Sequence, residues 1–157
     1  MNVPAHMPDI RTLVPHSGQM VMLDRALSAD TDMLCAEVRV HPGSVLADET
    51  GVGAWVGIEY MAQAIAAHAG WLALQRGGEV KVGFLLGSRK YEAKVSQFAL
   101  GEVLHVHVHR VLQAENGLGA FECRIDIAGG MAAAATATVT VFQPANVNQF
   151  LKDGNVG

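Results

Sequence analysis

Residues 52–76 hold the only long helical pattern in this sequence, so the rest of the fold must be arranged around it. Ala, Met, Leu and Gln dominate the segment, and Gly77 and Gly78 predict its end. The segment is apolar on nearly every side. We therefore expect other elements to wrap around the helix, because a surface helix would show a polar face.

The other long segments alternate between apolar and polar residues, as half-buried β-strands do. Asn116-Gly117 and Gly129-Gly130 supply turn signals between the later strands. The alternating segments are residues 33–41, 104–111, 121–127 and 135–142. The order is two strands, one helix and then about four long strands. This order predicts an α+β fold, in which an antiparallel sheet of about six strands wraps round one long central helix.

The chain length of 157 residues fits a single domain with its own core. We place that domain at residues 1–143. The segment 144–157 is polar and we expect it to fray. A short helix is predicted from Pro8 to Val14, because Asp9 suits a first turn.

The composition argues against several functional classes. A formal net charge of −4 without a clustered basic face gives no reason to expect nucleic acid. No apolar run is long enough to span a membrane, and no leader pattern is seen. Cys35 and Cys123 lack metal-ligand spacing and are expected to be reduced thiols. We therefore expect a cytoplasmic protein with no metal site.

Glu59 is the carboxylate that lies within this apolar helical segment, and Gln63 follows it by one turn on the same face. Burial among apolar side chains favours the protonated carboxyl, whereas the nearby helix N-terminus favours the charged form. The sequence leaves open which effect dominates. Glu59 is either a functional acid or a carboxylate that backbone groups satisfy.

Three segments carry a family resemblance: VPHSGQMVMLDR at 14–25, IEYMAQA at 58–64 and GFLLGSRKYEAKVSQFALGEVLHVHVHRV at 83–111. Together they resemble the hot-dog fold 3-hydroxyacyl-ACP dehydratases of fatty acid synthesis. The IEYMAQA segment is the most specific of the three. With Asp-Glu-Thr-Gly before the helix, the chain looks like the dehydratase-like proteins of bacterial aryl polyene clusters.

The resemblance implies elimination of water from a 3-hydroxyacyl thioester on an acyl carrier protein. The 4′-phosphopantetheine group would arrive as part of that substrate, so no other cofactor is implied. In the family a histidine takes the C2 proton and a helix carboxylate protonates the departing hydroxyl, which assigns the acid role to Glu59. The residues expected to contact substrate are Gln63, Asp48, Gly53 and Trp55.

The family histidine is missing, because Asp48 and Glu49 stand where it should fall. A histidine-bearing paralogue could supply the histidine in a heterodimer. Whether the chain forms a homodimer or such a heterodimer is left open, and either dimer is expected to form through edge-to-edge sheet pairing. Asp48, His41 or His16 could instead act as the base. Finally, the chain could be a silent subunit, or an acyl-thioesterase of the same fold.

Two further clusters of side chains allow more than one interpretation. Arg89, Lys90 and Lys94, with Arg76 and Lys81 nearby in the sequence, would suit docking of an acidic carrier protein, or simply be solvated positions. The HVHVH segment at 105–109 places three histidines on one strand face. Spacing alone is weak evidence for a metal, and a half-polar strand face is the simpler interpretation. His68 is expected to pack against the sheet.

Overall fold

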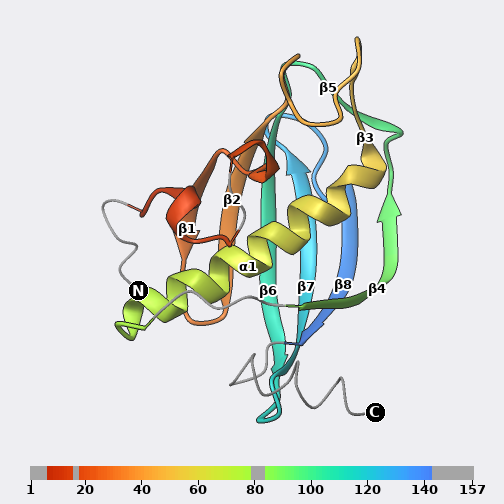
Figure 1. Ribbon diagram of the computed structural model, residues 1–157. Helices are drawn as coiled ribbons and strands as arrows, with labels where there is room; N and C mark the ends of the chain where they lie inside the picture. Colours follow the sequence, from red (N-terminus) through yellow and green to blue (C-terminus); the bar gives the residue numbers. More distant parts are fainter. Residues whose placement is uncertain (1–6, 16–17, 79–83, 143–157) are drawn as a thin grey trace, which may run out of the picture.

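One long helix crosses one face of a six-stranded antiparallel sheet in this computed structural model (Figure 1). The structure describes residues 7–15, 18–78 and 84–142. In spatial order the sheet contains β1 (Arg25–Ala29), β2 (Met33–Arg39), β6 (Val103–Gln113), β7 (Leu118–Ile127), β8 (Ala135–Phe142) and β4 (Phe84–Ala93). The helix α1 spans Gly57–Gln75. The predicted α+β class and the six-stranded sheet are confirmed.

The alternation predicted for the strands positions the core. On β6, Leu104, Val106 and Val108 are completely buried, while the intervening residues are partly or fully exposed. Successive side chains of a strand point to opposite faces, so one face of β6 is directed toward the core and the other toward solvent. The core therefore lies between the sheet and α1.

The helix begins later than predicted, because residues 51–53 form a short strand. This strand, β3 (Gly51–Gly53), pairs with β5 (Gln97–Ala99) in a separate two-stranded sheet. Val52 and its pairing partner Phe98 are both completely buried, so this pairing adds to the core. A 3-10 turn, Ala54–Val56, then leads into α1.

The helix ends where the two glycines predicted it would. Gly77 adopts a φ of +71°, and the N–H of Gly78 donates to the carbonyl of Ala73 at 2.8 Å. This left-handed residue and its backward hydrogen bond form a glycine C-terminus.

Other elements wrap around the helix, as expected: it is covered on two sides and left half-exposed on a third. The sheet covers one side. The segment before β1 covers another, and a Cβ at Gly70 would overlap the backbone of Leu13. Ile58, Ala62 and Ala66 are only partly buried. A sheet on one face and a single short segment on the other do not suffice to enclose a 19-residue helix.

The segment before β1 is less helical than predicted. Ile10–Thr12 forms one 3-10 turn, which the Asp9 carboxylate caps by accepting the N–H of Arg11 at 2.9 Å. The predicted C-terminal tail, 144–157, lies outside the described residues. Within the described ranges, no helix is long and apolar enough to cross a membrane.

Candidate functional site

Three of the predicted site residues lie at the start of α1. Gly53 ends β3, Trp55 lies in the 3-10 turn, and Glu59 lies in the first turn of the helix. The strand β4 is fixed against this region, because the Tyr91 hydroxyl donates a hydrogen bond to the carbonyl of Ala54. A Cβ at residue 57 would overlap that hydroxyl, which explains the glycine there.

The Glu59 side chain is half-buried and not enclosed. The expectation of a fully buried carboxylate is therefore corrected, since the face of α1 that carries it is the uncovered one. Among the residues that the structure describes, no hydrogen bond or ion pair to the Glu59 carboxylate is present. The backbone-satisfied alternative is thus not observed. The carboxylate is available to a ligand or to a partner subunit.

Gln63 is completely buried, one turn after Glu59. Its Oε1 accepts the N–H of Met22 at 2.9 Å, and its Nε2 donates to the carbonyl of Met20 at 2.7 Å. Both ends of the amide therefore hold the segment before β1 against the helix. This contact is a structural one, and the expected contact of Gln63 with substrate stays a prediction.

Asp48 organises the loop that precedes β3. Its Oδ1 accepts the N–H groups of Thr50 at 2.8 Å and Gly51 at 3.0 Å. The hydrogen bond from the Thr50 backbone is the main reason that the pKa of Asp48 lies below its ordinary value. A carboxylate stabilised in its charged form is a weak base. The geometry thus disfavours Asp48 as the substitute base, and its contact with substrate stays a prediction.

Trp55 is 66% exposed, unusual for so large an apolar side chain. A Cβ at Gly53 would overlap the Trp55 indole, so the absence of a side chain at position 53 accommodates this ring. We expected Gly53 to permit close approach of the acyl-thioester arm. In the structure the close neighbour is Trp55, and the predicted contacts of both residues with substrate are untested.

No histidine among the described residues contacts the Glu59 carboxylate. His41 lies in the loop after β2, where its Nδ1 accepts the N–H of Gly43 at 3.0 Å. His68 is buried, as expected: it bonds the carbonyl of Asp30 at 2.9 Å and packs edge-on against Phe121. His16 lies outside the described residues.

The three histidines of β6 share one strand face, as predicted. His107 lies 3.2 Å from the carboxylate of Asp126, and burial lowers the pKa of this histidine. In the described part of the chain, no three His, Cys, Asp or Glu side chains come together in a way that could hold a metal ion. The two cysteines are free thiols, and burial raises the pKa of Cys35 to about 11.

The predicted docking residues separate into two places. Lys90 and Lys94 are exposed and flank Tyr91, so they lie near the start of α1. Arg76 follows the other end of the helix, roughly 28 Å away at 1.5 Å per residue. The Arg89 side chain and Lys81 lie outside the described part of the structure.

Sequence reasoning did not single out Tyr60, the neighbour of Glu59. This residue is only 2% exposed, and it points to a different side of α1 from Glu59. The sequence pattern that identified Glu59 could also have identified Tyr60, because in both cases a polar group interrupts an otherwise apolar helix.

Comparison with known proteins gives a family and a fold. The ApeP-like dehydratase family matches residues 8–152. A chain of the dehydratase heterocomplex ApeI:P from Xenorhabdus doucetiae is 28% identical, with a TM-score of 0.85 over 96% of this chain and 99% of that one. A hypothetical thioesterase from Streptococcus pneumoniae, solved with coenzyme A, is 15% identical with a TM-score of 0.59 (76% and 84% covered), which shows the fold alone. No curated protein sequence matches.

Proposed function

This chain belongs to the ApeP-like dehydratase family, and we propose that it is a dehydratase subunit whose Glu59 completes a site shared with a histidine-bearing partner. The substrate is a 3-hydroxyacyl group on the phosphopantetheine arm of an acyl carrier protein. The chain belongs to a dehydratase family, whereas its thioesterase neighbours share only the fold.

The reaction needs one base and one acid. The partner's histidine takes the C2 proton as the bond between C3 and the hydroxyl oxygen breaks. Protonated Glu59 donates its proton to the departing hydroxyl, which leaves as water, and the product is an enoyl thioester. Glu59 ends the step as a carboxylate and the histidine as an imidazolium, so proton transfer between them restores the starting state.

The observation that carries the proposal is the isolation of the Glu59 carboxylate. It lies on the half-exposed face of α1 and has no partner among the described side chains, while His41 and His68 are held by other groups. A chain similar to this one occurs in a dehydratase heterocomplex, which supports the heterodimer over the homodimer.

The sheet offers a suitable edge for such a partner. β4 is the last strand of the six-stranded sheet, with β8 on one side of it. Edge-to-edge pairing at β4 would place the partner beside the start of α1, where Tyr91 holds the two elements together. Lys90 and Lys94 would then lie at the entrance and attract an acidic carrier protein. Two free thiols agree with a reducing compartment such as the cytoplasm.

The test is an assay of the purified chain alone and after mixing with a histidine-bearing dehydratase-like protein encoded beside it. The substrate is a 3-hydroxyacyl carrier protein. We expect enoyl absorbance only from the mixture. Full activity of the isolated chain would contradict the shared site, and release of free thiol would identify a thioesterase.

A further inference from the structure

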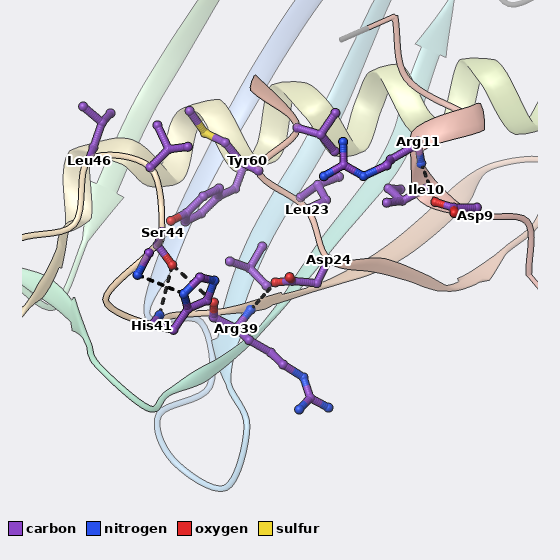
Figure 2. Close-up of a pocket in the computed structure, with 15 residues that line it drawn as sticks. Asp9, Ile10, Arg11, Leu23, Asp24, Arg39, His41, Ser44, Leu46 and Tyr60 are labelled. Atoms are coloured by element: carbon purple, nitrogen blue, oxygen red, sulfur yellow. Dashed lines mark hydrogen bonds between the residues drawn. The ribbon is translucent and has the colours of Figure 1, made fainter. Parts of the chain in front are cut away.

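A cavity of about 710 Å³ lies between α1, the segment before β1 and the loop after β2 (Figure 2). Glu59 does not line this cavity, so it is distinct from the site described above. Apolar side chains such as Val21 and Val38 form part of its wall. Its polar lining residues are Asp9, Arg11, Asp24, Arg39, His41, Ser44 and Tyr60. A volume of this size lies within the usual range for small-molecule sites.

The Tyr60 hydroxyl is a donor without a protein partner, at the accessible tip of a side chain that is otherwise buried. The residue is 2% exposed, and Figure 2 shows its ring directed from α1 toward the loop that carries Ser44. No described residue hydrogen-bonds to the hydroxyl, although the Tyr91 hydroxyl is satisfied by Ala54. Burial, and then the charge of Asp24, raises the pKa of Tyr60 to about 12. The hydroxyl therefore keeps its proton at neutral pH.

His41 offers a second donor. Because its Nδ1 accepts the N–H of Gly43 at 3.0 Å, the proton of the neutral ring lies on Nε2. The backbone N–H of His41 donates to Ser44 Oγ at 3.0 Å, which fixes the loop. A Cβ at Gly43 would lie 3.0 Å from the imidazole, so the glycine gives the ring room to lie against the loop.

The Asp24 carboxylate disfavours an anionic ligand at the Tyr60 end of the cavity. The Asp24 carboxylate lies on the wall, where its Oδ2 accepts the N–H of Arg39 at 2.6 Å and its other oxygen has no partner among the described residues. The Arg39 guanidinium is turned outward and bonds Glu37 at 2.9 Å. Arg11 donates to the carbonyl of Gly18 at 3.0 Å. An anion beside Tyr60 would meet the charge of Asp24.

We propose that this cavity binds an uncharged small molecule that carries an amide or hydroxyl group. The ligand oxygen accepts a hydrogen bond from the Tyr60 hydroxyl, which has no protein partner. A donor of the ligand bonds the free oxygen of Asp24, and His41 Nε2 donates to a second acceptor. The proposal stands independently of the dehydratase site.

Two tyrosines make the test direct, because the full chain contains only Tyr60 and Tyr91. Protein labelled with ¹³C at tyrosine and histidine is titrated with N-acetylethanolamine, an uncharged amide alcohol, and followed by NMR. We expect saturable shifts at Tyr60 and no change at Tyr91. N-acetylglycine keeps the amide but adds a negative charge, and we expect it to bind at least tenfold more weakly.

Substitutions distinguish the contribution of the Tyr60 hydroxyl to binding from that of the Tyr60 ring. Tyr60→Phe, followed at the His41 signals, should weaken N-acetylethanolamine binding about tenfold, as expected for one lost hydrogen bond to the ligand. Tyr91→Phe is the matched control and should bind as the wild type does. Any one of three results would overturn the proposal. The wild type shows no saturable shift at Tyr60, N-acetylglycine binds as tightly as N-acetylethanolamine, or Tyr60→Phe leaves the affinity for N-acetylethanolamine unchanged.

Discussion

The Oε1 atom of Gln63 lies 2.9 Å from the backbone nitrogen of Met22 and accepts its hydrogen bond, across a sequence separation of 41 residues. The Nε2 atom of the same amide donates to the carbonyl of Met20. One completely buried side chain therefore attaches the segment before β1 to α1, one turn beyond Glu59. This contact holds together the wall of the cavity and the helix that presents the candidate acid.

Gln63→Leu keeps most of the side-chain volume but removes both hydrogen bonds. The backbone groups of Met22 and Met20 lose their partners, so we expect the free energy of unfolding to fall by about 1–3 kcal/mol. Urea denaturation measures the change. Gln75→Leu, at the exposed last residue of α1, is the control and should have little effect. Equal effects of the two substitutions would show that the amide contacts contribute nothing.

Gly70→Ala tests the close approach of α1 to the segment before β1. Alanine is the better helix former, yet its Cβ would overlap the Leu13 backbone, which cannot move without displacing the segment. We expect destabilisation of about 1–3 kcal/mol by thermal or urea unfolding. Gly87→Ala, which meets no atom within 4 Å, serves as the control. Stabilisation by Gly70→Ala would mean that the contact is absent.

His68 predicts a pH dependence of stability. Burial lowers its pKa below the ordinary value of 6.5, so below that pH the unfolded chain binds more protons than the folded one. The free energy of unfolding should therefore fall as the pH drops below 6.5. The contribution of His68 to this fall ends once the pH is below the pKa of His68 in the folded chain. The slope from one such group is at most about 1.4 kcal/mol per pH unit.

His68→Gln should flatten that slope in denaturation measured at several pH values, whereas His109→Gln, on the exposed end of β6, should retain it. A slope that His68→Gln leaves unchanged would assign the pH dependence to other groups.

Lys90→Glu with Lys94→Glu tests carrier-protein docking near the start of α1. Reversing two exposed charges should weaken binding of an acidic carrier protein by roughly threefold to tenfold at low salt, and by less at high salt. The single variants Lys90→Glu, Lys94→Glu and Arg76→Glu each reverse one charge, and Arg76→Glu, at the far end of the helix, should bind normally. If all three substitutions weaken binding alike, the effect comes from net charge and not from a docking surface.

Local pattern predicted the parts of this fold that depend on neighbours in sequence. Gly77 stops the helix, and the alternation at 104–108 divides β6 into a buried and a polar face. The short strand at Gly51–Gly53 was missed because three residues carry no periodicity. It exists only through pairing with Phe98, far along the chain.

The same distinction between local sequence pattern and long-range contacts applies to the candidate site. The sequence placed Glu59 in the helix, but its half-exposure depends on how much of α1 the other elements cover. The inward turn of the Gln63 amide depends on Met20 and Met22, and the open hydroxyl of Tyr60 depends on a cavity built by three separate segments. These are tertiary relationships, which hydrophobic periodicity does not encode.

The most direct test of the shared-site account is the rate of dehydration by the reconstituted complex of this chain with its histidine-bearing partner, measured with Glu59→Gln. Because the carboxylate has no partner among the described residues, the substitution should leave folding and assembly intact. Glu49→Gln, in the exposed loop before β3, is the control. We predict a loss of about 10²–10⁴-fold in rate for Glu59→Gln alone. An unchanged rate in an intact complex would contradict the account.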